Sequence, residues 1–202
     1  MFNITLLKCK RTDARYQAIR DRHYVENRGT HGQQLHYLIF LNDELIGDDT
    51  DHELIGIISG ASSVWAVKSR DLFFGLNNDN KKVALPSIIN NTVFRLERHR
   101  KNLASFVLAL WRKRIAQDWE ERYSVVVHGF ETFVVEEDFR KGTLYKADNW
   151  VFLGETQGST KRHSGLENKS IRVETNKKLI FAKKIKGTGL STSYTPTWNI
   201  KK

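Results

Sequence analysis

Apolar residues recur every three or four positions in one long segment of the chain, the spacing that places side chains on one face of an α-helix. These positions are Leu103, Phe106, Val107, Leu110, Trp111 and Ile115. They predict an amphipathic helix over residues 102–119 that buries this face in a core. Asn102 is a good N-cap residue, because its side chain can accept a hydrogen bond from a free amide of the first turn.

Segments rich in β-branched and aromatic residues lie on both sides of this helix. The stretches 90–96, 125–135 and 150–155 predict strands, and a short helix is expected at 143–147. This alternation of strands and helices predicts an α/β (α+β) protein.

The pattern in the rest of the chain adds further elements. The N-terminal part predicts a strand at 2–10, a helix at 13–22 and two antiparallel strands at 36–40 and 54–59. The short alternation in 177–186 is compatible with one more strand, whose buried face the pattern does not decide.

One carboxylate stands out within the predicted strand 125–135. Alternation places Glu131 on the same face as Val127, Gly129 and Phe133. A lone carboxylate among such neighbours costs free energy to bury without a partner. Glu131 is therefore expected to be ion-paired, a metal ligand or a general base.

The loop before the long helix is strongly basic. Arg98, Arg100 and Lys101 add three formal positive charges to the positive end of the helix dipole at Asn102. This arrangement predicts a site for a phosphate or a carboxylate, which the Ser105 hydroxyl in the first turn could assist. An ordinary solvated loop before a core helix is the alternative.

Two further residues are candidates for chemistry. His23 lies in a polar segment outside any apolar stripe, and together with Glu131 it would form a minimal ligand set for Fe(II) or another divalent metal. A surface histidine is the simpler interpretation. Arg95, on the strand before the basic loop, could hold a carboxylate or phosphate, or pair with Glu97 or Glu131.

Composition and charge narrow the class of protein. With 40% hydrophobic residues the chain is globular rather than disordered, and no apolar run reaches the length of a membrane span. The single cysteine, Cys9, excludes an intramolecular disulfide and suits the cytoplasm. Residues 161–202 carry +9 of the net charge of +10. We expect a domain over 1–160 and a basic C-terminal extension over 161–202 that contacts nucleic acid, with a solubilising tail as the alternative.

The order of a strand, a helix preceded by a basic loop, a second strand and the sequence LY…NWVFLGETQG resembles the second half of the GNAT acyltransferase fold. This resemblance implies a mixed, mainly antiparallel sheet flanked by helices. It also implies that Tyr145 acts as general acid towards the leaving thiolate of coenzyme A. The pyrophosphate loop of that superfamily usually contains glycine, and residues 98–104 contain none, which argues against acetyl-coenzyme A as the donor.

Several segments resemble a narrower family. They are HYVENRG, GQQLHYLIF, IINNTVFRL, KNLASFVLAL, DWEERY and GTLYKADNWVFLGETQGSTKR, in this order within residues 15–162. They are similar to the family that contains the DruA component of the Druantia anti-phage system, and to the GNAT-like Mom protein of phage Mu, which modifies adenine in phage DNA.

This similarity implies a DNA-modifying transferase that adds a small acyl-derived group, of acetamido or carbamoylmethyl type, to the exocyclic amine of adenine and so protects phage DNA from restriction. Glu131 or Tyr145 would handle protons. A DruA-like defence or mobile-element factor that binds DNA without modifying it is one alternative. A conventional acetyl-coenzyme A-dependent N-acetyltransferase is another.

Double-stranded DNA is the partner that this similarity implies, and adenine would have to be flipped or distorted to be reached. Aromatic side chains that could stack on a base are Tyr24, Trp65 and Trp150. Amide side chains that could contact a base edge are Asn90, Asn91 and Asn149. Cations expected at the phosphates, besides those of the basic loop, are Arg140, Lys141, Lys161 and Arg162. We expect Glu131, Tyr145 and the start of the long helix to meet in one cleft.

Overall fold

The computed structural model describes residues 2–25, 32–42, 52–137, 140–163 and 170–187, and of residues 159–163 and 170–174 it describes only the backbone. The strands are β1 (Ile4–Cys9), β2 (Gln34–Asn42), β3 (His52–Ser62), β4 (Ile88–Leu96), β5 (Gly129–Val135), β6 (Val151–Glu155), β7 (Ser159–His163), β8 (Ser170–Glu174) and β9 (Lys178–Lys184). The helices are α1 (Ala14–Arg20), α2 (Lys68–Phe74), α3 (Lys81–Ala84), the 3₁₀ turn η1 (Leu85–Ser87), α4 (Leu103–Tyr123) and α5 (Thr143–Ala147).

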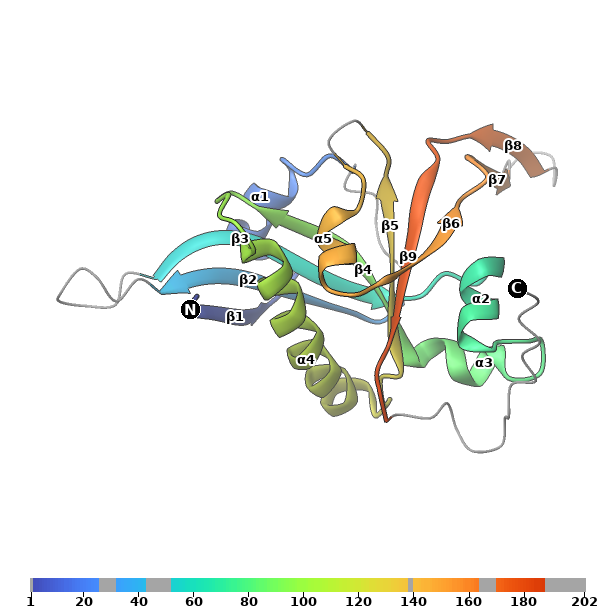
Figure 1. The fold of residues 1–202 in the computed structure, drawn as a ribbon, viewed down its shortest axis with the longest axis horizontal. Coiled ribbons are helices and arrows are strands. Elements are labelled where there is room, and N and C mark those ends of the chain that lie inside the picture. The colour runs from blue at the N-terminus through green and yellow to red at the C-terminus, as the bar shows by residue number, and fades with distance from the viewer. Residues whose placement is uncertain (1, 26–31, 43–51, 138–139, 164–169, 188–202) are drawn as a thin grey trace.

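Seven of the described strands form one twisted sheet in the order β1-β2-β3-β4-β5-β9-β6 (Figure 1). All neighbours pair antiparallel except β4 and β5, which are parallel. This topology confirms the expected mixed, mainly antiparallel sheet flanked by helices. Strands β7 and β8 form a separate antiparallel pair. None of the described helices is long and apolar enough to cross a membrane.

Strand β9 comes from the segment that the charge pattern assigned to a C-terminal extension. It lies inside the sheet, between β5 and β6, and Phe181 and Ala182 at its centre are fully buried. The sheet therefore includes residues from both sides of the predicted domain boundary at residue 160. The alternation in 177–186 correctly indicated a strand.

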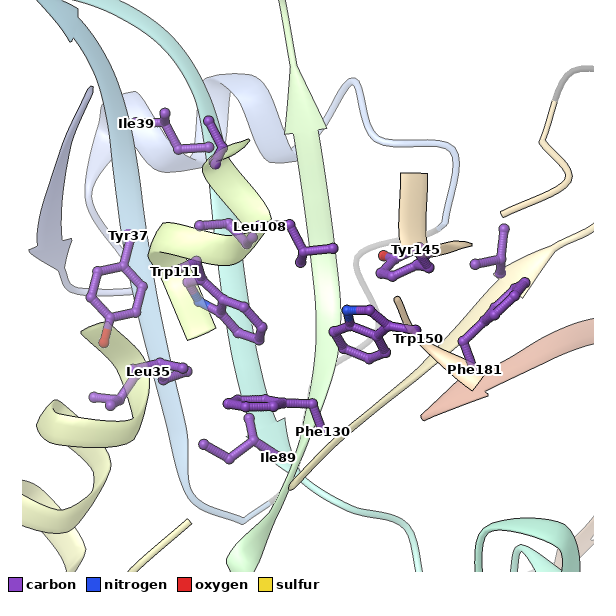
Figure 2. Close-up of a cluster of buried hydrophobic side chains, with 14 of the residues drawn as sticks. Leu35, Tyr37, Ile39, Ile89, Leu108, Trp111, Phe130, Tyr145, Trp150 and Phe181 are labelled. Atoms are coloured by element: carbon purple, nitrogen blue, oxygen red, sulfur yellow. The ribbon is translucent and has the colours of Figure 1, made fainter. Parts of the chain in front are cut away.

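The two faces of the sheet are covered by different helices. Helices α4 and α5 cover one face, which we call the α4 face, and enclose the largest hydrophobic cluster (Figures 1 and 2). On the opposite face, α1 packs on Leu38, Ile57 and Val93, whereas α2 packs through Phe74 near Ile88. We call this second face the α2 face.

The long helix α4 follows the predicted apolar stripe and extends past its predicted end to Tyr123. Its side chains at four-residue spacing are fully buried: Leu103, Val107, Trp111, Ile115 and Trp119. Leu108 is also buried, whereas Phe106 and Leu110 are only half-buried. The buried face of α4 was predicted correctly, but the buried stripe widens toward Leu108 and not toward Phe106 and Leu110.

The parallel pair β4–β5 is short. Its register joins four residue pairs, from Ile88 with Gly129 to Asn91 with Thr132. Both strands then continue without pairing to each other. Strand β4 also has an irregularity at this point, because its partner β3 pairs Ser59 with Val93 and the next residue with Asn91. A bulge of this kind redirects a strand, so β4 and β5 part after Asn91 and Thr132.

A buried ion pair joins α2 to β5. Arg70 Nη1 donates to Glu131 Oε2 at 2.7 Å, and both side chains are fully buried. Arg70 also donates to Asp71 Oδ1 and to the carbonyl of Val64, each at 2.7 Å. Of the three roles expected for Glu131, the structure shows ion pairing. Burial raises the pKa of Glu131, and the Arg70 charge, with donors of Ser63 and Val64 nearby, opposes this rise.

We predict that Arg70→Met destabilises the fold by about 3–5 kcal/mol, because it leaves the Glu131 carboxylate buried without its cation. Without Arg70 the folded-state pKa of Glu131 rises further above its unfolded value. The free energy of unfolding of the variant should therefore increase as the pH falls from about 8 to about 5, since a protonated Glu131 needs no cation.

Urea unfolding of the wild type, Arg70→Met and the double variant Arg70→Met/Glu131→Gln measures both effects. The double variant should recover part of the lost stability at neutral pH. A loss below about 1 kcal/mol for Arg70→Met, the range of an exposed pair, would contradict the dependence of the buried Glu131 carboxylate on its cation.

Candidate functional site

A pocket of about 360 Å³ lies on the α4 face, where β4 ends and α4 begins. We call it the α4 pocket. It is lined by Phe94, Leu96, Arg98, His99, Arg100, Lys101, Ala104 and Leu144. The strand and α5 thus supply apolar surface, and the loop supplies cations.

The electrostatics of the α4 pocket favour an anion. Arg98, Arg100 and Lys101, the cations predicted from the sequence, all line it. Arg98 Nε donates to Glu53 at 2.7 Å, but both side chains are exposed, so this pair holds Arg98 only weakly. The first turn of α4 adds amides without partners within the helix and the positive end of its dipole. A phosphate group fits these donors.

Asn102 does not make the capping hydrogen bond expected of it. It precedes the first residue of α4, as predicted, but its side chain accepts no bond from the first turn. Its backbone is left-handed, with φ 64°. Asn adopts this conformation more readily than most residues other than glycine. The loop therefore has the backbone conformation that glycine favours although residues 98–104 contain none, and this weakens the sequence-based argument against a coenzyme A donor.

The Ser105 hydroxyl has a local partner. It donates to the Asn102 carbonyl at 3.1 Å. This bond accounts for a serine in the first turn without a ligand, and an anion would have to compete with it.

Tyr145 lies where β4 and β5 part. Its hydroxyl donates to Asn91 Oδ1 at 2.8 Å and lies 3.4 Å from the Thr132 hydroxyl. Its ring packs between Trp150 and Phe181 (Figure 2). Only 6% of the residue is exposed. Burial raises its pKa, so the phenol is protonated at neutral pH and is a weaker acid than an exposed tyrosine.

The short helix α5 holds Tyr145 in this place. It begins after Gly142, whose φ is 67° and whose missing Cβ would lie 2.3 Å from the Phe181 ring. Only glycine fits there without displacing Phe181. At the other end of α5, Asp148 accepts bidentate hydrogen bonds from Arg112 of α4, both at 2.7 Å. The two helices are therefore linked beside the phenol.

A cluster of aromatic and cationic side chains forms around residues that the sequence singled out. The His23 ring stacks on Tyr24 at 4.5 Å, and the Arg140 guanidinium lies 3.8 Å from the Tyr24 ring centroid. Arg140 also pairs with Glu137 at 2.7 Å. Tyr24 is close enough to Tyr145 to affect its pKa electrostatically, which places this cluster near the parting strands.

His23 is not arranged as a metal ligand with Glu131. Its Nδ1 accepts a hydrogen bond from the amide of Val25, and burial together with Arg20 lowers its pKa to about 4. Glu131 has Arg70 as its partner instead. Within the described residues no group of three or more His, Cys, Asp or Glu side chains could hold a metal ion. The predicted pairing of His23 with Glu131 is therefore not observed.

The expectation that Glu131 and Tyr145 share a cleft is wrong. Glu131 lies on the α2 face with Arg70, whereas its neighbour Thr132 contacts Tyr145 on the α4 face. Successive strand residues point to opposite faces, which separates the carboxylate from the phenol. The pocket at the start of α4 is lined by Leu144 but not by its neighbour Tyr145, so a shared cleft for the phenol and the helix start stays a prediction.

The other predicted contact residues have varied positions. Arg95 donates to Glu97, one of the two predicted partners, and to the carbonyl of Arg22, both at 2.6 Å. Lys141 and Asn149 are exposed, and the left-handed Asn149 ends the turn after α5. Trp150 is buried and donates to Asp148, so it offers no stacking surface.

Lys161 and Arg162 belong to β7 by their backbone, and their side chains lie outside the described residues. The contacts of Asn91 and Thr132 with the Tyr145 hydroxyl were not predicted from the sequence. A consecutive pair of asparagines inside an apolar strand was the available signal for Asn91, because a buried carboxamide needs partners.

A second, larger opening lies on the α2 face. It has a volume of about 1180 Å³ and extends between α2, β5, β9 and β6. Among its lining residues are Trp65 and Asn90, which the sequence suggested for stacking and for base recognition. We call it the α2 groove.

Comparison with solved structures identifies the fold. NAA60 of Arabidopsis thaliana in complex with acetyl-CoA is 14% identical, with a TM-score of 0.56, and the match covers 92% of this chain and all of that one. A Bacillus subtilis acetyltransferase in complex with CoA is 8% identical, with a TM-score of 0.48 and coverages of 92% and 99%. At this identity the likeness to NAA60 establishes the fold alone, that of the GNAT acetyltransferases.

The microcin C7 self-immunity acetyltransferase MccE, in complex with acetyl-CoA and AMP, is 10% identical with a TM-score of 0.42. The match covers 75% of this chain, which spans 61% of the length of that protein. No protein of curated function matches the sequence.

The family is established by sequence. A family model described as Druantia protein DruA matches residues 4–194, nearly the whole chain. The protein therefore belongs to the DruA family, named for a component of an anti-phage system, and has the fold of GNAT acetyltransferases.

Proposed function

We propose that this protein is a transferase that takes a small acyl-derived group from a coenzyme A thioester and adds it to the exocyclic amine of adenine in DNA. The observation that carries this proposal is the position of the Tyr145 phenol. It lies at the parting of β4 and β5, and the preceding residue, Leu144, lines the basic α4 pocket.

The α4 pocket supports a coenzyme A thioester as the donor. Its cations and the first-turn amides of α4 suit a pyrophosphate. The left-handed Asn102 gives the loop one of the backbone conformations that glycine favours, although its side chain remains in place. NAA60 and MccE, which share features of this fold, have acetyl-CoA in their solved structures.

The chemistry needs one proton donor for the sulfur. The amine nitrogen attacks the thioester carbonyl carbon, the carbon–sulfur bond breaks, and the amine loses a proton to solvent. Tyr145 supplies a proton to the leaving thiolate and regains one from solvent. Burial raises the pKa of the phenol and so makes it a weaker acid, and its role therefore rests on its position: the hydroxyl has to turn from Asn91 to the sulfur.

Adenine in DNA as the acceptor rests on the similarity to the Mom protein and on charge. The chain carries a net charge of +10, of which residues 161–202 carry +9. Such a concentration of cations attracts a polyanion and steers its approach.

A second candidate function is DNA binding without modification. The observation that favours it is that the Tyr145 hydroxyl is already bonded to Asn91 and only 6% of the residue is exposed. In that case the phenol would only join the two strands.

Nucleoside analysis of cellular DNA distinguishes the two functions. Plasmid DNA from bacteria expressing the protein should contain a modified deoxyadenosine of increased mass, detected by mass spectrometry of digested nucleosides. Tyr145→Phe should reduce its amount by about 10²–10⁴-fold, the usual contribution of one acid–base group.

The matched control is Tyr123→Phe, a tyrosine at the end of α4 that bonds to the backbone of Gln34. It should leave the modification unchanged. An unaltered nucleoside profile with the wild-type protein, at normal expression, would favour binding without modification.

Donor binding can be measured separately. The variant Arg100→Ala/Lys101→Ala should weaken the binding of coenzyme A by about 10–100-fold, because it removes two charges at the phosphates. Lys113→Ala, which removes an exposed charge of α4 away from the pocket, is the control. Isothermal titration calorimetry gives the affinities, and equal binding by all three proteins would refute the assignment of the α4 pocket.

DNA affinity should fall steeply with salt. The slope of log affinity against log salt is about −0.9 for each phosphate neutralised, so Lys161→Ala/Arg162→Ala should reduce it by about 1.8. Fluorescence anisotropy with a labelled duplex at several salt concentrations measures the slope. Salt-independent binding of the wild type would contradict contact with the phosphates.

A further inference from the structure

The α2 groove lies on the face of the sheet opposite the α4 pocket. Its volume of about 1180 Å³ exceeds the ~300–1,000 Å³ typical of a small-molecule pocket. Residues that line it and bear on its chemistry are Trp65, Lys68, Lys81, Asn90, Phe133 and Lys178. Such an extended opening suits a segment of a polymer.

Trp65 is the most unusual side chain of the groove. It is 58% exposed, although tryptophan is the residue that gains most from burial. Lys81 holds it in place, because its ammonium lies 5.0 Å from the ring centroid and is itself bound by Asp71. Leu72, also 58% exposed, lines the same groove. A held but uncovered indole is a platform on which a planar ring can stack.

Asn90 supplies a polar group without a partner. Only 8% of the residue is exposed, yet its Oδ1 accepts no hydrogen bond from the described residues. A buried acceptor of this kind costs free energy unless a ligand or water satisfies it. Asn90 lines the groove, but its Oδ1 is fully buried, so the side chain has to turn toward the groove before a donor of a bound ligand reaches it. The carboxamide of asparagine matches the N6 amine and N7 of adenine.

The charges around the groove fit a nucleic acid strand. Lys68, at the start of α2, is exposed, and Lys178, at the start of β9, is half-buried. Two acids also line the groove: Asp71, which is paired with Arg70 and Lys81, and the exposed Glu155. Cations together with an exposed aromatic side chain in one groove are the combination found where single-stranded nucleic acid is bound.

The position of the groove relative to the Tyr145 phenol also suits a site for the acceptor. Asn90 faces the groove, and the next residue, Asn91, accepts the hydrogen bond of Tyr145 on the opposite face. A ligand on Asn90 and a donor in the α4 pocket would therefore approach the parting of β4 and β5 from opposite faces of the sheet.

We propose that the α2 groove binds an unpaired or flipped adenine of DNA, with its ring stacked on Trp65 and its exocyclic amine donating to Asn90 Oδ1. This inference rests on the proposed function, because it supplies the acceptor site for the same reaction. Lys68 and Lys178 contact the phosphates on either side of the base.

Binding without any thioester donor tests the proposal independently of catalysis. The probe is a short fluorescein-labelled single-stranded DNA with one adenine among thymines, measured by fluorescence anisotropy. Trp65→Ala should weaken binding by about tenfold, as for the loss of one stacked base, and Trp65→Phe should retain most of it. Phe152→Ala, which removes an aromatic side chain of similar exposure that packs towards Phe181 on the α4 face, should bind as the wild type does.

A second oligonucleotide replaces the adenine with purine, which lacks the exocyclic amine. The wild type should bind it about tenfold more weakly, and Asn90→Leu should bind both oligonucleotides equally. Unchanged binding by Trp65→Ala, or an equal loss with Phe152→Ala, would overturn the proposal. Either result would leave the transferase function standing if modified deoxyadenosine is still found in plasmid DNA. Binding of a peptide in place of DNA at Trp65 would likewise overturn it.

Discussion

The architecture depends on the limited pairing of β4 with β5. Four residue pairs join the two strands, and after Asn91 and Thr132 they part. Backbone groups freed at such a point need other partners. Tyr145 fills the gap from the α4 face, donating to the Asn91 side chain, while the Thr132 hydroxyl donates to the Asn91 carbonyl at 3.0 Å. The openings on the two faces, the α4 pocket and the α2 groove, both lie beside this parting.

Two ion pairs, one fully buried and one half-buried, hold the helices that shape these openings. Arg112 with Asp148 links α4 to the end of α5, and Arg70 with Glu131 links α2 to β5. Buried pairs are not efficient sources of stability, because both charges lose their hydration. Their geometry is specific, however, and each pair joins an element beside the site to the sheet or to α4. They fix the position of the phenol and of the α2 groove more than they add to the free energy of folding.

Local patterns predicted much of the fold, and long-range contacts explain what they missed. The stripe from Leu103 to Ile115 indicated α4. Alternation placed Glu131 among apolar neighbours, where its carboxylate needs a charged partner. The partner, Arg70, is 61 residues away in the sequence, so no local pattern could identify it. The left-handed backbone of Asn102 was equally hidden, since an asparagine before a helix usually indicates a side-chain cap. The α2 groove combines residues of several elements and becomes visible only in three dimensions.

The central claim is that a coenzyme A thioester and its acceptor meet at the parting of β4 and β5. A crystal structure of the protein with coenzyme A tests it most directly. The account predicts the pyrophosphate at the start of α4, contacted by Arg100 and Lys101, and the sulfur beside the Tyr145 hydroxyl between the two strands. Coenzyme A bound elsewhere, or with its sulfur away from Tyr145, would contradict it.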